Sequence, residues 1–343
     1  MKIIDTLWIL LDLNYDCNRR CSFCPYVPVR DNGDYGDFTD GMIDVLSDKL
    51  GLFIEKYSIE KIKFFISGGE PLLYPQKPLD FSNKIRRLNV PVSISLYTNG
   101  DFLTSEIVKS YSDRKVKIAL SAGEDSLDEI VRKVNILKTG YEFPRVNVVL
   151  SRQNLYRLEK IVQSALDNRY LLRFRGQYNI SDDPKLPELY ETYVPKALEL
   201  YGTADYLNIK SLYHTYEDCI PNWNEVKTPY ICGRSFLYVN SLGQIKSCGG
   251  NPYSDTVGSI FDWNDPIEKL KESVERGDSG RWSAKNLQEC QGCEVYELCQ
   301  GGCPLTRRFA YGRFDRKSPY CSGYKKAFKI FKDIVRRNDD STG

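Results

Sequence analysis

The sequence predicts an α/β protein in which a partial (β/α)6 barrel of the TIM-like type is followed by a cysteine-rich domain. Between residues 6 and 201, a short apolar segment with strand character is followed six times by a segment with helical spacing. Six units are fewer than the eight that close a full barrel, so we expect an open sheet. The alternation stops near residue 205, and turns and cysteines then dominate as far as Cys321.

The expected elements follow one another in strict order along the chain. The predicted strands are Thr6–Asn14, Lys61–Ser67, Pro91–Tyr97, Val116–Ser121, Arg145–Leu150 and Tyr170–Gly176. The predicted helices are Asp40–Lys56, Leu79–Arg87, Leu103–Tyr111, Leu127–Lys138, Leu155–Asp167 and Leu186–Tyr201, and a basic amphipathic helix over Tyr324–Arg337 is expected to pack on the protein surface. Repeated β/α units imply parallel strands joined by right-handed crossovers.

Composition and charge place the chain among ordinary globular proteins. Of its 343 residues, 41% are hydrophobic and 27% charged, which is enough apolar material for a sizeable core. The net charge of +2 disfavours nucleic acid or an anionic membrane as a partner. The N-terminus has no signal-peptide pattern and no apolar run approaches a membrane span, so we expect a cytoplasmic protein. The expected domains are 1–204, 205–323, and a helix and tail over 324–343.

Eleven cysteines and a single histidine, His214, make up the most informative part of the composition. A reducing cytoplasm disfavours disulfides, so clustered cysteines indicate metal or iron–sulfur ligation. The near absence of histidine argues against a histidine-based zinc site and against a Cys–His nucleophile pair. The sequence therefore favours sites in which thiolates are the ligands.

Cys17, Cys21 and Cys24 form a C-x3-C-x2-C loop directly after the first predicted strand. Three thiolates can hold three irons of a [4Fe–4S] cluster and leave the fourth iron open to a small chelating ligand. The alternative is part of a structural zinc site. Zinc, however, requires a fourth ligand, and no cysteine or histidine follows within almost two hundred residues.

Glycines and a glutamate follow at the end of the second predicted strand, as Gly68-Gly69-Glu70-Pro71. The carboxyl ends of barrel strands carry the active site, and glycine lets a backbone approach a ligand closely. Together with the cysteine loop and Phe23 before its last cysteine, this motif resembles the radical S-adenosylmethionine (SAM) superfamily.

The resemblance implies that SAM binds the open iron and is cleaved reductively to a 5′-deoxyadenosyl radical. It implies that Gly69 and Glu70, next to Gly68, bind the methionine amino group, and that Phe23 lies beside the adenine. Positions after the later strands match further SAM contacts of the family: Thr98, Asn99, Ser121 and Leu150. A turn is the alternative interpretation of the Asn99-Gly100 pair.

Eight further cysteines resemble the SPASM extension of this superfamily, which carries two auxiliary [4Fe–4S] clusters. By resemblance, one cluster takes Cys219, Cys232, Cys248 and Cys303, and the other takes Cys290, Cys293, Cys299 and Cys321. Cys219 is assigned because two clusters require eight thiolates; a free thiol that donates a hydrogen atom or a proton is the alternative. Paired zinc knuckles are the alternative for the whole set.

The resemblance to SPASM enzymes favours hydrogen abstraction from a peptide or protein, leading to oxidation, crosslinking or epimerisation. Gly249 follows Cys248 where formylglycine-generating members carry an aspartate, which disfavours sulfatase maturation. The alternative is a small-molecule dehydrogenase, decarboxylase or epimerase in cofactor or natural-product synthesis. Expected partners are the substrate, a flavodoxin- or ferredoxin-type electron donor and a separate leader-peptide-binding protein, because the first strand begins close to Met1.

Overall fold

The computed structural model describes residues 6–33, 35–176, 183–204, 236–246, 256–262, 265, 266, 268, 269, 287–299, 301–313 and 315–340. These residues belong to two compact units. One comprises residues 1–120, 135–142 and 231–276, and the other comprises 121–134, 143–230 and 277–343. No helix in the described ranges combines the length and apolar character that crossing a membrane requires.

The first unit is built on parallel strands β1 (Thr6–Asp12), β2 (Lys61–Ser67), β3 (Val92–Thr98) and β4 (Val116–Ala122). They pair in the order β4-β3-β2-β1, with Leu10 opposite Phe65 and Phe65 opposite Ser95. The other edge of β1 pairs in parallel with β7 (Phe236–Val239), and β8 (Gln244–Lys246) and β9 (Thr256–Ser259) continue the sheet as antiparallel strands. The strands in the described part of the chain do not close into a barrel, which confirms the predicted open α/β architecture.

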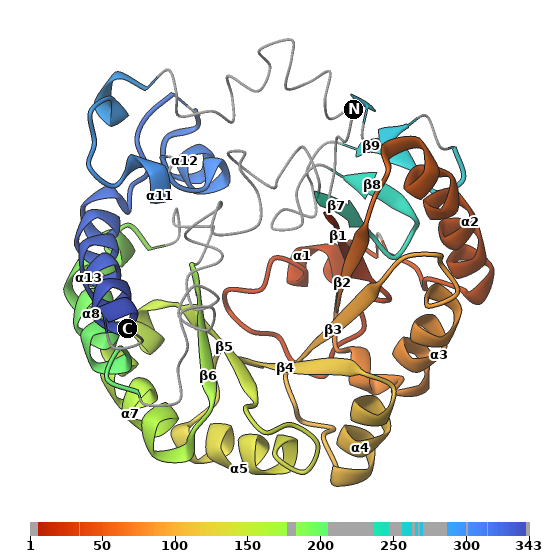
Figure 1. The fold of residues 1–343 in the computed structure, drawn as a ribbon, viewed down its shortest axis with the longest axis horizontal. Helices are drawn as coiled ribbons and strands as arrows, with labels where there is room; N and C mark the ends of the chain where they lie inside the picture. Colours follow the sequence, from red (N-terminus) through yellow and green to blue (C-terminus); the bar gives the residue numbers. More distant parts are fainter. Residues whose placement is uncertain are drawn as a thin grey trace. The chain divides into compact units, whose positions relative to one another are not determined.

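Helices α2 (Asp40–Tyr57), α3 (Gln76–Ile85) and α4 (Ser105–Asp113) cover one face of this sheet, as Figure 1 shows. The alternate residues of β2 that face them are fully buried, and Phe64 packs edge-on against Phe81 of α3. Because alternate strand residues face opposite sides, Trp8, Phe65 and Tyr97 lie on the other face. Their rings stack at 5.6 Å and 5.9 Å between centroids, across three strands.

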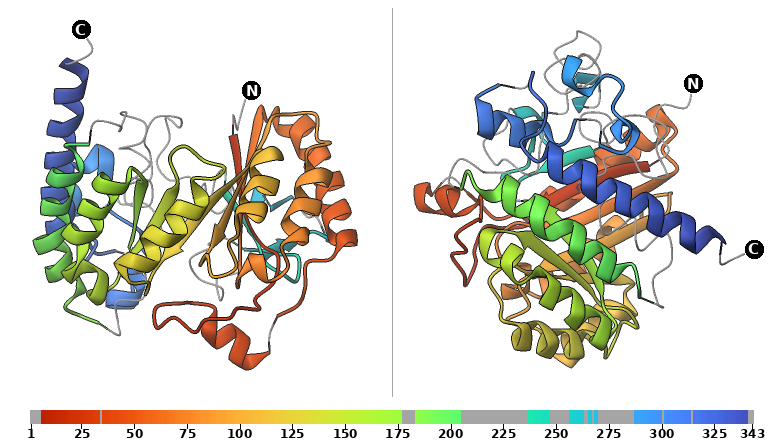
Figure 2. Two further views of the ribbon diagram at one scale, coloured as in Figure 1. Left: turned by 90° about the horizontal axis from the view of Figure 1, so that it is seen from below. Right: turned by 90° about the vertical axis from the view of Figure 1, so that its left-hand side faces the viewer.

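The second unit contains α5 (Leu127–Leu137, shared at its end with the first unit), β5 (Arg145–Leu150), β6 (Leu171–Gly176) and the helices around them. Strands β5 and β6 pair in parallel. Its other helices are α6 (Arg152–Tyr156), α7 (Leu158–Asn168), α8 (Leu186–Tyr201), α11 (Tyr296–Cys299), α12 (Pro304–Tyr311) and α13 (Cys321–Asp340), with the short turn η3 (Gln288–Cys290). Helix α13 lies along α8, as both views in Figure 2 show, and this confirms the expected surface-packed helix.

Most elements keep the predicted order, and three of them have the predicted bounds: β2, β5 and α8. The predicted helix over Leu155–Asp167 is wrong as a single element, because it is divided into α6 and α7 at Arg157. The side-chain amide of Asn154 donates to the carbonyls of Gly123 and Val149, which holds this turn at the end of β5. The short helix α1 (Val27–Asn32) and the turn η1 (Pro71–Leu73) were not predicted.

Candidate functional site

Cys17, Cys21 and Cys24 lie on one loop between β1 and α1, and all three thiols are half-buried. The backbone N–H of Cys24 donates to the carbonyl of Cys21 at 3.1 Å, and the N–H of Arg19 donates to the Cys17 sulfur at 3.4 Å. Burial raises the pKa of the Cys24 thiol, while the backbone N–H of Tyr26 acts in the opposite direction. The loop is therefore folded around its thiols, with backbone donors aimed at sulfur.

Arg30, which the sequence analysis did not single out, holds this loop from α1. Its guanidinium donates to the carbonyl of Cys17 at 3.4 Å and to the carbonyl of Arg19 at 3.0 Å. The contacts fix carbonyls that a tight loop would otherwise leave without donors. The only signal in the sequence was a basic residue six positions after the last cysteine.

The two glycines after β2 pack directly against the cysteine loop. The N–H of Gly69 donates to the Asn14 carbonyl at 2.8 Å, and the N–H of Glu70 donates to the Asp16 carbonyl at 2.7 Å. A Cβ on Gly68 would lie 2.1 Å from the Asn14 oxygen, and one on Gly69 would lie 2.0 Å from the Asp16 oxygen. Gly68 also has φ +116°, which side chains rarely adopt. The close approach that requires glycine is thus to the protein's own backbone.

Glu70 is 1% exposed, and its carboxylate joins three segments of backbone. One oxygen accepts from the N–H of Leu72 at 2.9 Å and from the Thr98 hydroxyl at 2.7 Å, and the other accepts from the N–H of Asn99 at 2.7 Å. Burial raises the pKa of Glu70, and these three donors oppose that effect. A carboxylate has about four acceptor positions, so one remains for the predicted bond to an ammonium group.

Asn99 connects the end of β3 to the interior of the cysteine loop. Its side-chain amide donates to Asn18 at 2.9 Å, and its side-chain oxygen accepts from the N–H of Asp101 at 2.9 Å. The Asp101 carboxylate in turn accepts from Asn18 at 2.8 Å and forms an ion pair with Arg19. The sequence analysis missed Asn18, Arg19 and Asp101. Asp101 lies 83 residues from Asn18 and 82 from Arg19, and no local pattern in the sequence reports such a contact.

The remaining predicted SAM residues are placed separately. Phe23 is half-buried on the cysteine loop. Ser121 and Leu150 belong to the second unit, where Ser121 is half-buried in β4 and Leu150 is buried at the end of β5. The SAM contacts of all these residues stay predictions.

A buried carboxylate, Asp12, lies at the end of β1 beneath this site. Its side chain accepts from the Tyr238 hydroxyl at 2.6 Å, and that hydroxyl shares a 2.7 Å hydrogen bond with Tyr15. Burial raises the pKa of Asp12 to about 7, against the opposing effect of the tyrosine donors. Cys24 packs against the cluster that contains Tyr15 and Tyr26, so these buried tyrosines join Asp12 to the cysteine loop.

In the second unit, four predicted ligands line one small cavity: Cys290, Cys293, Cys299 and Cys321. Short turns bring them together, with the N–H of Cys293 donating to the Cys290 carbonyl at 3.3 Å and the N–H of Cys299 donating to the Val295 carbonyl at 2.9 Å. The donor set is all thiol, as an iron–sulfur cluster requires. Cys303 is half-buried at the start of α12, whereas Cys219, Cys232, Cys248 and Gly249 lie outside the described residues.

Among the described residues, no three cysteine, histidine or acidic side chains lie close enough to share a single metal ion. Both described cysteine sets offer thiols alone, the ligands that iron–sulfur clusters take.

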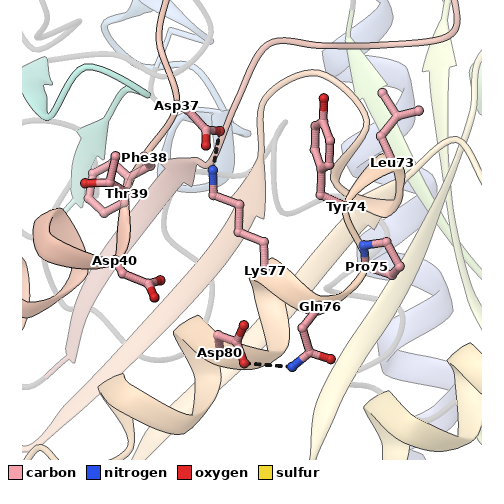
Figure 3. A pocket seen from close by; sticks show the side chains of 10 residues that line it. All are labelled: Asp37, Phe38, Thr39, Asp40, Leu73, Tyr74, Pro75, Gln76, Lys77 and Asp80. Atoms are coloured by element: carbon pink, nitrogen blue, oxygen red, sulfur yellow. Dashed lines mark hydrogen bonds and ion pairs between the residues drawn. The ribbon is translucent and has the colours of Figure 1, made fainter.

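A separate cavity of about 630 Å³ lies where α2 and α3 begin (Figure 3). Lys77 reaches across it to pair with Asp37, and Gln76 donates to Asp80 at 2.7 Å. None of the predicted SAM contacts lines this cavity. Tyr74, at its edge, donates to Asp16 at 2.9 Å and so ties the cavity to the base of the cysteine loop.

The fold and this loop define an α/β iron–sulfur enzyme of the open-barrel type. Residues 13–143 match the sequence profile of the Radical SAM superfamily. This part of the chain is a radical SAM domain, and the chain as a whole resembles SPASM-domain members of the superfamily.

Two relatives and one solved structure illustrate the similarity. The chain is 24% identical to a cysteine-type anaerobic sulfatase-maturating enzyme of Clostridium perfringens over 91% of this chain and 92% of that protein. It is 22% identical to the PqqA peptide cyclase of Bradyrhizobium diazoefficiens over 98% of this chain and 91% of that protein. The solved structure, native anSMEcpe with bound AdoMet and Cp18Cys peptide, has a TM-score of 0.74 at 19% identity and matches 98% of this chain and 99% of that one. That match shows the fold alone.

Proposed function

We propose that this radical SAM enzyme modifies a peptide by abstracting hydrogen from it. In the proposal, Cys17, Cys21 and Cys24 hold the catalytic [4Fe–4S] cluster, and SAM bound there supplies a 5′-deoxyadenosyl radical. The observation that carries this proposal is the three-cysteine loop fixed against the Gly68-Gly69-Glu70 segment by two backbone hydrogen bonds. These two bonds, the backbone clamp, hold the residues just before Cys17 against the glycine segment.

The chain's own residues support the proposed SAM site through position. Glu70 has one acceptor place left after its three protein donors, which suits a bound ammonium group. The glycine segment offers backbone carbonyls without side chains in the way. Phe23, Ser121 and Leu150 remain proposed contacts for the adenosyl part.

A peptide is the favoured substrate for two reasons. The two named relatives are a sulfatase-maturating enzyme and a peptide cyclase, and both match nearly the whole chain. The half-buried Phe65 and Tyr97 rings lie beside the buried Trp8 on the sheet face opposite α2–α4, and aromatic rings there suit the apolar side chains of a peptide. Gly249 in place of aspartate argues for a reaction other than formylglycine formation.

The proposal also assigns auxiliary clusters. Cys290, Cys293, Cys299 and Cys321 would hold one cluster, and Cys219, Cys232, Cys248 and Cys303 the other. The common cavity supports the first set; the second set rests on the resemblance. Three clusters predict about twelve iron atoms per chain. We further propose a cytoplasmic location, and a domain boundary near residue 204.

The test is SAM cleavage by the iron-loaded, reduced protein under anaerobic conditions, followed by liquid chromatography of 5′-deoxyadenosine. Cys21→Ala should abolish cleavage and remove about four iron atoms, whereas Ser22→Ala on the same loop should retain both. A peptide encoded beside the gene, fully deuterated, should transfer deuterium to 5′-deoxyadenosine. Intact SAM in the loaded wild-type protein would refute the radical SAM assignment. Deuterium transfer only from small molecules would refute the proposal that the substrate is a peptide.

A further inference from the structure

The rim of the cavity formed by Cys290, Cys293, Cys299 and Cys321 is basic. Lys317 and Lys325 line the same cavity as the four cysteines, and both are exposed. The opposing charge in that lining is Glu289, whose carboxylate accepts from the backbone N–H of Lys317 at 3.0 Å. Within the described residues, neither lysine has an ion pair within 4 Å. Two ammonium groups therefore face solvent at the mouth of the cavity.

The charge of this segment is opposite to that of the rest of the chain. Residues 287–337 contain eleven Lys and Arg against five Asp and Glu, a formal +6, while the whole chain is only +2. Several of these cations are engaged: Lys326 pairs with Glu191 at 2.7 Å and Lys329 pairs with Glu294 at 2.8 Å. Lys332 donates to the carbonyl of Glu294 at 3.0 Å. Lys317 and Lys325 line the cavity without an ion pair among the described residues, and Arg316, next to Lys317 in the chain, is also exposed.

Two of the four cysteines and both lysines give this cavity its contact with solvent. Cys290 and Cys299 are 9% and 7% exposed, whereas Cys293 and Cys321, which share the cavity lining with Lys317 and Lys325, are half-buried. Cys321 begins α13 and Lys325 follows it by one helical turn, so both side chains lie on one face of the helix and line the same cavity.

We propose that this basic rim is the docking surface for an acidic one-electron carrier protein of the flavodoxin or ferredoxin kind. The inference rests on the proposed cluster at these four cysteines. In the step it serves, one electron leaves the reduced carrier and enters the oxidised [4Fe–4S]²⁺ cluster, giving [4Fe–4S]⁺; no bond or proton is exchanged. Lys317 and Lys325 attract the carrier and orient it, as charged surfaces do in fast protein association.

The test compares Lys317→Glu/Lys325→Glu with the wild-type protein. Binding of an oxidised acidic flavodoxin is measured by titration calorimetry, and cluster reduction by reduced flavodoxin is followed by stopped-flow absorbance. Reversing two rim charges should weaken binding and slow reduction about tenfold or more at low salt. The difference should shrink as salt rises, because screening shortens the reach of the charges. The control, Lys160→Glu/Lys196→Glu, changes two exposed lysines of α7 and α8, outside the cavity lining, by the same charge.

Two further readouts separate docking from damage. Photoreduced 5-deazariboflavin, an uncharged reductant, should reduce the variant and wild type at equal rates. A basic acceptor protein, cytochrome c, should be reduced faster by the variant than by wild type. Equal flavodoxin rates in all proteins, or equal slowing with both carriers, would overturn the docking surface while leaving the cluster in place. If iron analysis finds no cluster on the Cys290 set, both the auxiliary-cluster assignment and this inference are overturned, and SAM cleavage still tests the catalytic site.

Discussion

Glu70→Gln distinguishes a carboxylate that holds the protein together from one that only binds SAM. In the structure one oxygen accepts from Leu72 and Thr98, and the other accepts from the N–H of Asn99. Glutamine can keep the first two bonds only by turning its NH₂ group towards the Asn99 N–H. Two donors then face each other in a site that is 1% exposed.

The cost follows from that arrangement. A buried N–H without an acceptor costs about 1–3 kcal/mol, and the two remaining hydrogen bonds lose the advantage of a charged acceptor. We expect a loss of about 2–4 kcal/mol in the free energy of unfolding. For a chain of 343 residues unfolding in one step, this corresponds to a fall in Tm of about 3–6 °C.

The assay is thermal unfolding of the anaerobic protein without SAM, together with iron content and SAM affinity. Glu159→Gln on α7, an exposed position, is the matched control and should leave all three unchanged. Because the end of β3 also holds Asn18 of the cysteine loop through Asn99, we expect the Glu70 variant to lose iron as well. An unchanged Tm and iron content with weaker SAM binding would refute the structural role and leave only the ligand role.

Three other changes have expected outcomes. Gly69→Ala should lower the iron content several-fold, because the new Cβ would lie 2.0 Å from the Asp16 carbonyl oxygen. The control Gly51→Ala in α2, where a Cβ meets nothing within 4 Å, should keep its iron, and equal iron in both variants would contradict the role of the backbone clamp. Asp12→Asn should remove a pH dependence of the free energy of unfolding. Because burial raises the pKa of Asp12 to about 7, its contribution to stability is full below about pH 4 and is lost as the pH rises to 7. Urea unfolding should show wild type losing about 3 kcal/mol more than the variant between pH 5 and pH 8, and a loss on going down in pH would contradict it; the amide oxygen still accepts from Tyr238. Cys299→Ala should remove about four of about twelve iron atoms yet retain the catalytic cluster's SAM-bound spectrum, and loss of all iron would count against separate clusters.

Local pattern was sufficient to predict the repeating part of the fold. In β2 every second residue is buried, so the alternation in the sequence fixes both its bounds and its faces. The break between α6 and α7 could not be predicted, because it depends on the Asn154 amide reaching Gly123, thirty-one residues away. The pairing of β7 with β1 has the same cause, since no local pattern reports a partner more than two hundred residues distant.

The candidate site likewise has parts that local sequence predicts and parts that depend on contacts between distant segments. Cysteine spacing alone placed Cys17, Cys21 and Cys24 on one loop, because adjacent positions in a chain cannot be far apart. The role of the glycines was only half predicted: close approach is required, but the approached group is the Asp16 carbonyl. The Asp101–Arg19 pair and the Asp12–Tyr238 bond join distant segments, so they could be found only in three dimensions.

The parallel pairing of β7 with β1 limits how the chain can be shortened. A fragment ending after α8 would leave the hydrogen-bonding edge of β1 open along Trp8–Leu11, and would remove the hydroxyl that Tyr238 donates to Asp12. An uncovered strand edge beside a buried acid invites self-association. A fragment of residues 1–201 should therefore aggregate when made by itself. During synthesis, β1 can pair along this edge only after the chain has been made as far as residue 239.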